Sequence, residues 1–511
     1  MEFDVLIQNG TVIDGTGSQG YQADIGIVGD VIQAIGNLQG SQAKKTIDAT
    51  GKVVCPGFID VHVHSELAVL DGPDKYAPLK MGVTTQLASP DGFSWAPLTG
   101  NKFREMQQYL SIFYTDQTIR EHTEMSIADL LAVSEGNLPS NIVLQVPHGP
   151  VRLQVVGWDD RPATDEEIGQ MQRLVREWME AGAVAFATGL EYEPMRSSDV
   201  RELAGLSKIV AEYGGVYVAH QRGYAERVKT GSSETIAVAK EANIPVHISH
   251  FTVDEDAAAM VQQGLQDGAE ITFDMYPYAA GSSHLLKNLP DFMQVGPPEN
   301  VLTRLKDPKY RAMMSEYLES HVAPELIHFA AVGEGAPSWE GKSLKDVQEE
   351  MGLDLTNAIS EVLIQSNLQA LMIMHWPEHR VHFLEDTFKH PLHMVSTDGI
   401  YIGKRPHPRG FGTYPRVLRE YVLKNQWLTM EQAIYKMTGF PAKRFNIKGR
   451  GVLGSNQYAD VVVFDPQTIA DKATFEQPRQ DPVGIEHVFV NGHHVIEKGQ
   501  VHPGNPGRIQ R

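Results

Sequence analysis

The sequence contains a single cysteine, Cys55, among 511 residues, and this scarcity excludes two kinds of site. One cysteine cannot form a disulfide within the chain, and it cannot supply a cluster of thiolate ligands for a metal. Cys55 directly precedes Pro56 at the end of an apolar run, which favours a small buried side chain over a reactive thiol.

Positive charge and long apolar runs are also scarce. Lys and Arg total 44 against 64 Asp and Glu, a net charge of −20, which disfavours nucleic acid and acidic membrane surfaces as partners. No stretch approaches the roughly 18 apolar residues of a membrane span, and the acidic first ten residues lack the features of a signal peptide. We expect a cytoplasmic enzyme with a small-molecule partner, either monomeric or a homo-oligomer.

Two common catalytic loops are absent. The sequence has no Gly-x-x-x-x-Gly-Lys-Ser/Thr phosphate loop and no Gly-x-Ser-x-Gly nucleophile turn. Nucleotide hydrolysis and serine-esterase chemistry therefore lose their support.

A pair of histidines closes an apolar run near the start of the chain. After Pro56 and Gly57, the run 58–61 leads to His62 and His64. Side chains alternate faces along a strand, so these two imidazoles point the same way and can bind one divalent cation. The short pattern alone favours ordinary core or surface histidines, so the other ligands decide its meaning.

The two ends of the chain share a β-type texture. Short apolar runs in the first 55 residues are broken by turn signals such as Asn9-Gly10 and Asp14-Gly15, and the runs 459–465 and 487–492 repeat this pattern. Neither end has enough strands to bury a face alone. We predict one small β-sandwich domain built from residues 1–55 and 447–511.

Residues 56–446 alternate apolar runs with helical patterns, which indicates β/α units and a parallel sheet. The predicted fold class is α/β, with a TIM-like (β/α)8 barrel in this region. The gap at roughly 280–370 is too long for a loop, so we predict a lid or insertion there. The expected strands are Phe58–Val63, Val83–Leu87, Ile142–Val146, Val184–Ala187, Val216–Ala219, Val246–Ile248, Ile271–Phe273 and Met394–Ser396.

Potential ligands follow several of these strands. His220 ends the fifth, His250 follows the sixth, and Asp398 follows the eighth. A parallel barrel brings the carboxyl ends of its strands to one mouth, where they meet His62 and His64. Each residue alone is a weak signal, whereas the set predicts a metal centre. By alternation, His247 faces elsewhere and receives no role.

These residues give the chain a resemblance to the metal-dependent amidohydrolase superfamily. More narrowly, the chain resembles the N-acyl-D-amino-acid deacylases, or D-aminoacylases, over essentially its whole length. The narrower match is carried by the runs 189–194, 276–278, 396–399, 407–413, 436–442 and 459–465. The hydantoinase branch usually has a carboxylated lysine at the fourth strand end, and the run 185–189 contains no lysine.

The resemblance implies a divalent metal, most often zinc, with one or two ions, and hydrolysis of an acyl amide by a metal-activated water. A bound divalent cation lowers the pKa of its water to about 7 and polarises the scissile carbonyl. Asp398, as both metal ligand and catalytic group, would take the proton of the water and return it to the leaving nitrogen. The alternative for Asp398 is an aspartate that caps the turn before Gly399.

Two positions depart from the family pattern. Asp91 stands where these deacylases have a metal-binding cysteine, so we assign it as a ligand while noting that a loop aspartate in an Asp-Gly turn also fits. Thr252 stands where the family commonly has a lysine near the substrate carboxylate. Asp91 affects which metal ions bind and how many, and Thr252 affects whether a substrate carboxylate is recognised.

Four further residues are candidates for substrate binding. Arg409 can hold a carboxylate with its guanidinium fork, although a surface arginine is the alternative. Tyr192, Tyr278 and Ser283 resemble substrate-contacting residues of the family, and aromatic packing explains the tyrosines almost as well.

Three functions follow from these residues. The first is an N-acyl-D-amino acid deacylase. The second, favoured by Thr252, is an amidohydrolase of the same superfamily that acts on a cyclic amide, a carbamate or a xenobiotic amide without a free carboxylate. The third is a non-catalytic metal- or ligand-binding relative, which the retention of all the histidines and Asp398 disfavours.

Overall fold

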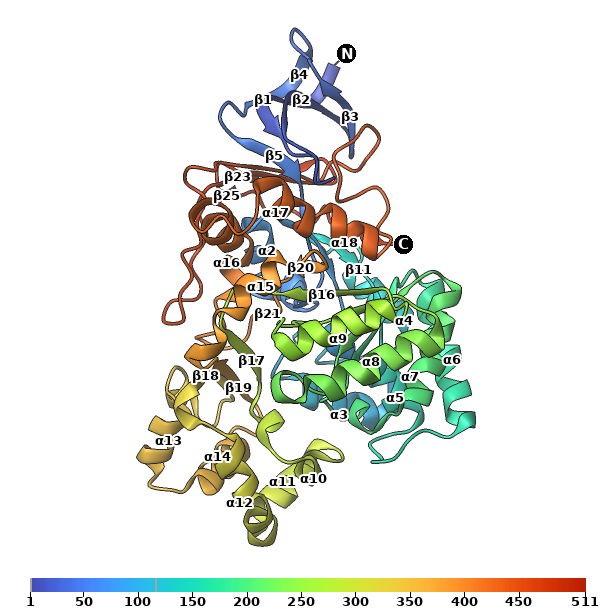
Figure 1. Cartoon of the computed structure of the whole chain (residues 1–511), viewed down its shortest axis with the longest axis vertical. Helices are drawn as coiled ribbons and strands as arrows, with labels where there is room; N and C mark the ends of the chain where they lie inside the picture. The colour runs from blue at the N-terminus through green and yellow to red at the C-terminus, as the bar shows by residue number, and fades with distance from the viewer. Residues whose placement is uncertain (1, 115–116) are drawn as a thin grey trace.

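The computed structural model describes residues 2–114 and 117–511, and the two ends of the chain meet in one nine-stranded sheet. The sheet runs β25-β24-β23-β22-β5-β1-β2-β3, with β4 also paired to β1, and the blue and red segments lie together at the top of Figure 1. Its strands are β1 (Glu2–Val12), β2 (Tyr21–Val28), β3 (Val31–Gly36), β4 (Gln42–Asp48), β5 (Val53–Pro56), β22 (Val461–Phe464), β23 (Ile485–Val490), β24 (His493–Glu497) and β25 (Gln500–Val501).

Antiparallel pairing of β5 with β22 joins the N-terminal strands to the C-terminal ones. Apolar side chains from both ends, including Ile7, Ile25, Val461 and Phe489, share one buried cluster. The sequence predicts a β-sandwich from these strands, and in the structure hydrogen bonds join them into one continuous sheet. The sandwich arrangement stays a prediction.

Parallel strands make up the centre of the chain, and their pairing runs in an ordered series. β6 pairs with β8 and β8 with β11; β12 continues through β13, β14, β15 and β16 to β20; and β21 pairs with β7, which follows β6. The fold is α/β. These strands are β6 (Phe58–Asp60), β7 (Val63–His64), β8 (Val83–Leu87), β11 (Asn141–Val143), β12 (Gln145–Pro147), β13 (Ala185–Gly189), β14 (Val216–His220), β15 (Val246–Ile248), β16 (Ile271–Met275), β20 (His393–Val395) and β21 (Gly399–Ile400).

The first predicted strand is interrupted at Val61 and His62, between β6 and β7. The buried Asp60 carboxylate replaces the missing ladder bonds, because it accepts hydrogen bonds from the backbone N–H of Thr397 at 3.0 Å and from the Thr397 hydroxyl at 2.6 Å. The backbone N–H of Asp398 then donates to the carbonyl of His62 at 2.7 Å. This break brings His62 and Asp398 together.

Amphipathic helices pack beside the parallel strands, and α6 to α9 form a visible layer in Figure 1. Helix α6 (Asp165–Glu180) begins with a capping box between Thr164 and Glu167 and buries Ile168, Met171, Val175 and Trp178, as its 3.6-residue period predicts. The other helices of this part are α1 (Ala68–Asp71), α2 (Ala77–Lys80), α3 (Gly100–Leu110), α4 (Ile127–Ser134), α5 (His148–Val155), α7 (Val200–Glu212), α8 (Val228–Ala242), α9 (Glu255–Gln266), α15 (Phe383–Lys389), α16 (Arg409–Arg416), α17 (Met430–Met437) and α18 (Gly439–Arg444).

The segment between β16 and β20 has an antiparallel sheet and an apolar cluster of its own. It lies at the opposite end of the molecule from the N-terminal sheet, coloured yellow in Figure 1. We call β17 to β19 together with α10 to α14 the insertion. Its elements are β17 (Ala280–His284), α10 (Asp291–Gln294), α11 (Pro298–Lys306), α12 (Pro308–His321), β18 (Ile327–Val332), α13 (Leu344–Met351), α14 (Leu355–Gln365) and β19 (Ala370–His375).

Within residues 2–114 and 117–511, no helix is both long enough and apolar enough to cross a membrane.

Candidate metal centre

Six histidine and aspartate side chains gather where the parallel strands end. They come from separate places in the chain: the break after β6, β7, the turn after β8, the last residue of β14, and the loops after β15 and β20. Five of them are at most 6% exposed, and His250 is partly buried. We call this set the metal cluster: His62, His64, Asp91, His220, His250 and Asp398.

Asp91 lies at the centre of the metal cluster. Its Oδ1 atom is 3.4 Å from Nε2 of His62 and 3.5 Å from Nδ1 of His220, and its Oδ2 atom is 3.7 Å from Nε2 of His64. Each carboxylate oxygen therefore faces a different set of imidazoles. This is the arrangement of a carboxylate that can bridge two ions.

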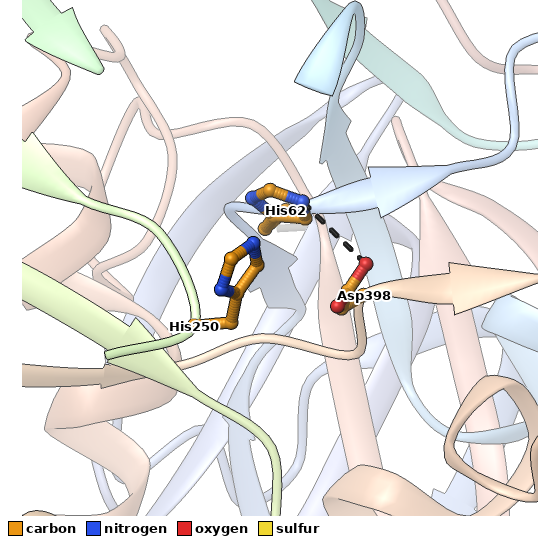
Figure 2. Close-up of side chains that lie close together, drawn as sticks. All are labelled: His62, His250 and Asp398. Carbon is orange, nitrogen blue, oxygen red and sulfur yellow. Dashed lines mark ion pairs between the residues drawn. The ribbon is translucent and has the colours of Figure 1, made fainter. Parts of the chain in front are cut away.

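Asp398 approaches the same histidines from the other side. Its Oδ1 atom is 3.5 Å from Nε2 of His62 and 3.4 Å from Nε2 of His64. Figure 2 shows His62, His250 and Asp398 converging on a common space from three different elements. The second oxygen of Asp398 lies 2.9 Å from Nη1 of Arg409, so the carboxylate is held on both sides.

The donor set fits a divalent metal. Three groups have ligand atoms that all lie within 4.8 Å of one another: His62, His250 and Asp398; His62, His64 and Asp91; and Asp91, His220 and His250. Within the described ranges, both ring nitrogens of His62 and Oδ1 of Asp91 are buried without a hydrogen-bond partner. Buried polar atoms normally have partners, so these atoms indicate a ligand that the protein itself does not supply.

The backbone is unusual at three cluster residues. Asp91, His250 and Asp398 have φ values of 54°, 38° and 48°, in the left-handed region that costs a residue such as histidine about 1–3 kcal/mol. Such conformations persist where the surroundings fix them, and they cluster at functional sites. Gly189 adds a close approach, because a Cβ atom there would lie 2.5 Å from the carbonyl oxygen of Asp91.

Glu191, which follows β13, orients His220. Its Oε2 atom is 3.0 Å from Nε2 of His220, so the imidazole turns its other nitrogen toward Asp91. Lys287, from the insertion, lies 2.8 Å from the same carboxylate, and Arg227 also contacts it. A carboxylate behind a metal-binding histidine fixes the tautomer and orientation of the ring. Sequence reasoning missed this role, although Glu191 lies just beyond a strand end in the matched run 189–194.

His247 lies outside the metal cluster, in keeping with its alternation along the strand. Its two ring nitrogens contact Thr272 and Asp274, each at 2.9 Å. Asp274 also accepts a hydrogen bond from the backbone N–H of His250 at 3.1 Å, which supports the left-handed turn there.

Electrostatics in the cluster favour ionised carboxylates and a neutral His250. Burial raises the pKa of Asp91, but the charges of His220 and His62 outweigh it and hold the pKa well below its usual value. Burial also raises the pKa of Asp398, and Arg409 reverses this effect. Burial, reinforced by the charge of His220, lowers the pKa of His250 to about 3. Metal ligands must be deprotonated, and this environment supplies Asp91, Asp398 and His250 in that form.

A cavity of about 450 Å³ opens over the metal cluster. Tyr192 and Ser283 line it, and their hydroxyl oxygens are 3.1 Å apart, so two of the predicted substrate residues lie together beside the metal site. Thr252 lines it too. Tyr278 is not among the lining residues and packs against His407 instead, while the nearby Tyr276 occupies the wall.

Arg409 is fully buried and is likewise not among the residues that line the cavity. Its guanidinium stacks 4.4 Å above the ring of Tyr276 and pairs with Asp398. This position makes Arg409 a support of Asp398.

His148 and Arg152 meet Glu202, and neither is among the residues that line this cavity. His148 Nε2 is 2.8 Å from the Glu202 carboxylate, and Arg152 pairs with the same carboxylate while donating to the carbonyl of Pro194 at 2.8 Å. They fix α5 against the start of α7.

The sequence-family model described as 'Amidohydrolase family' matches residues 45–496 of this chain. This chain belongs to the amidohydrolase family. Its members are hydrolases that act on carbon–nitrogen bonds, and the metal cluster lies within the matched region.

Full-length relatives narrow the comparison. The D-aminoacylase of Alcaligenes xylosoxydans xylosoxydans is 32% identical over 99% of this chain and 97% of its own length. The crystal structure of N-acyl-D-glutamate deacylase from Bordetella bronchiseptica, complexed with zinc and a phosphonate inhibitor, has a TM-score of 0.83 at 30% identity and covers all of both chains. A crystal structure of D-aminoacylase gives a TM-score of 0.82 at 30% identity over 99% of each chain.

Proposed function

We propose that this amidohydrolase cleaves the amide bond of an N-acyl-D-amino acid and releases the acyl group as a carboxylate. The observation that carries the proposal is the metal cluster, whose buried and unpaired ligand atoms converge at the mouth of a cavity. The full-length likeness to D-aminoacylase and N-acyl-D-glutamate deacylase supports this substrate class.

The metal is a divalent ion, most consistent with zinc, and the site holds one or two ions. Imidazole and carboxylate ligands suit zinc, and the structural relative from Bordetella bronchiseptica is complexed with zinc. Asp91 belongs to two of the three ligand groups, which supports a bridging role. When bound, a divalent cation lowers the pKa of a water to about 7 and polarises the amide carbonyl.

Asp398 is the catalytic acid and base. It accepts the proton of the attacking water and delivers it to the amide nitrogen, which must be protonated to leave. The ion pair with Arg409 at 2.9 Å and the backbone hydrogen bond to His62 hold the carboxylate in place for both transfers. Tyr192 and Ser283 line the cavity beside the cluster, which supports a role for both in substrate binding, and we keep Tyr278 as a proposed contributor from the adjoining turn.

The arrangement of the chain suits this chemistry. We infer that the ordered parallel strands form a (β/α)8 barrel over 56–446, since β21 pairs with β7 at the end of the series. Residues 1–55 and 447–511 would then form the separate small β domain. The insertion at 280–370 acts as a lid, supported by the contact of Lys287 with Glu191 beside the cluster.

A second candidate is an amidohydrolase that acts on a cyclic amide, a carbamate or another amide without a free carboxylate. Thr252 favours it, because this residue lines the cavity with an uncharged side chain at the position where the deacylases commonly have a lysine.

Metal analysis and a substrate panel test the proposal together. The purified protein should contain zinc or a similar ion, and His220→Ala or His250→Ala should lower both metal occupancy and turnover. The matched control His502→Ala removes an exposed histidine at the other end of the molecule and should change neither. A panel of N-acyl-D- and N-acyl-L-amino acids, with amides that lack a carboxylate, identifies the substrate class. Full activity after exhaustive chelation, with no metal detected, would exclude metal-dependent hydrolysis.

A further inference from the structure

Two lysine or arginine side chains, Lys287 and Arg380, line the cavity beyond the metal cluster. The ammonium of Lys287 is 2.8 Å from the buried carboxylate of Glu191, which in turn holds His220. The charge of Lys287 is therefore already matched by a group that supports the metal site. Arg380 comes from the turn that follows β19.

The guanidinium of Arg380 is fixed at one corner and has donors to spare. Its Nη2 atom donates to Asp254 at 3.2 Å, and the side chain is 18% exposed. Glu226 is the other acidic neighbour, 3.8 Å from Nη1 and 87% exposed. A guanidinium presents five N–H donors in a rigid fork, and the bond to Asp254 is the one hydrogen bond it makes to the described residues.

The anchor of Arg380 places it beside the metal cluster. Asp254 lies on the loop from β15 to α9, and the same loop carries His250 and Thr252. Thr252 and Arg380 both line the cavity, so a hydroxyl and a cation share this wall. A fork held at one corner in a largely buried wall is pre-organised to take a carboxylate with two parallel hydrogen bonds.

Arg409 is less suited to the same task. It is fully buried and ion-paired with Asp398, and it is absent from the residues that line the cavity.

We propose that Arg380 binds the free carboxylate of the substrate and so makes the enzyme selective for N-acyl amino acids over amides without a carboxylate. This inference rests on the proposed deacylase function. Arg380 thus supplies, in the same cavity, the positive charge that Thr252 lacks.

The test compares matched substrates in matched variants. Acetate release is measured for a panel of N-acetyl-D-amino acids and for their C-terminal N-methylamides, with wild type, Arg380→Gln and Arg380→Lys. Loss of a charge-assisted pair should raise KM for the acids about 10- to 100-fold in Arg380→Gln, with kcat nearly unchanged and the N-methylamides unaffected. Arg380→Lys keeps the charge without the fork and should lose less.

Lys229→Gln is the control for net charge, because Lys229 is an exposed residue on the neighbouring α8 that pairs with Asp256 outside the cavity. It should leave both substrate series unchanged. Titration of the best N-acetyl-D-amino acid into Asp398→Asn, with and without Arg380→Gln, gives a binding readout that does not depend on turnover.

The outcomes distinguish failure of the role proposed for Arg380 from failure of the proposed deacylase function. Equal losses on acids and N-methylamides, or no loss on either, would remove Arg380 from carboxylate recognition while leaving the deacylase function intact. A metal-loaded wild type that releases acetate from neither series would overturn the proposed function, and the inference with it. An Arg380→Gln protein that fails to fold leaves Arg380→Lys to decide, since equal KM increases on acids and N-methylamides in that variant would reject the proposal.

Discussion

The metal cluster and a second polar cluster, at the junction of the two chain ends, are both largely buried and differ in how their atoms are paired. We call the second one the junction cluster: Asn141, Arg450, Asp460 and Asn491. Arg450 contacts Asp460 and donates to Asn491 at 2.7 Å, and Asn491 donates to Asn141 at 2.8 Å. None of the buried side-chain nitrogen or oxygen atoms of this cluster lacks a partner within the described residues.

The metal cluster has the opposite character. Both ring nitrogens of His62 and one oxygen of Asp91 are buried and unpaired among the described residues. Burial and charge are common to the two clusters, so neither property distinguishes a functional site from a structural one. The difference is that the metal cluster brings together buried atoms that have no hydrogen-bond partner among the described residues. The side chains of the junction cluster instead form hydrogen bonds with one another, and these bonds connect β11, the start of β22 and the turn after β23.

The largest effect on catalysis is expected from Asp398→Asn in the metal cluster. The amide cannot carry the proton, so kcat should fall by about 10²–10⁴ while the fold and most of the bound metal remain. Steady-state kinetics, metal analysis and thermal unfolding of the same preparation measure all three. A variant that keeps more than about a tenth of the wild-type kcat would remove Asp398 from the acid–base role.

Arg450→Met tests the junction cluster and should give the reverse result. It leaves the buried Asp460 carboxylate without its cation, which should lower the free energy of unfolding by about 3–5 kcal/mol. The kcat of the folded, metal-loaded enzyme should not change. Denaturant unfolding with activity measurements checks this against Lys448→Met, a nearby exposed lysine. A loss of kcat without a loss of stability would mean that the junction cluster serves catalysis.

Substitution of Asp91 tests whether this residue is a metal ligand or only a turn residue. If it is a ligand, Asp91→Ala should weaken metal binding by more than the roughly 10–100-fold typical of a supporting residue. Its oxygen donor should also tolerate harder ions such as manganese better than a thiolate does, so Asp91→Cys should shift the preference toward zinc. Metal stoichiometry and metal-dependent activity of the three proteins measure both effects. Unchanged retention and rate in Asp91→Ala would identify a turn residue.

Local patterns in the sequence were sufficient to predict which strand-end residues the structure brings together. Alternation of side chains pairs His62 with His64, and the carboxyl ends of parallel strands explain why His220, His250 and Asp398 join them. The structure brings all five together with Asp91. The sequence also predicts a lid or insertion at roughly 280–370, because the gap there is too long for a loop.

Partners that depend on three-dimensional packing could not be predicted in this way. The contact between Glu191 and Lys287 joins a strand end to the insertion, and no local period relates the two. For the same reason, the sequence did not assign Arg409 to Asp398, because the ion pair depends on where α16 packs. Tyr276 and Tyr278 lie in one turn, and strand alternation does not specify which of them lines the cavity.

Glu191 combines features of the metal cluster and the junction cluster. Its carboxylate is fully paired, as in the junction cluster, yet one of its partners is His220 of the metal cluster. If its role is to orient that imidazole, Glu191→Gln should weaken metal binding about 10–100-fold, the effect typical of a residue that supports a metal ligand.

Competition with a chelator of known affinity measures the metal dissociation constant of Glu191→Gln directly. The matched control is Glu193→Gln, a buried glutamate two residues further along whose cationic neighbour is Arg196 at 4.0 Å rather than a cluster histidine. If Glu191 is purely structural, Glu191→Gln should lower stability, as Glu193→Gln does, and should leave the metal dissociation constant unchanged. A selective loss of metal affinity in Glu191→Gln, with partial recovery in Glu191→Asp, would show that a fully paired carboxylate can still serve the site through the residue it holds.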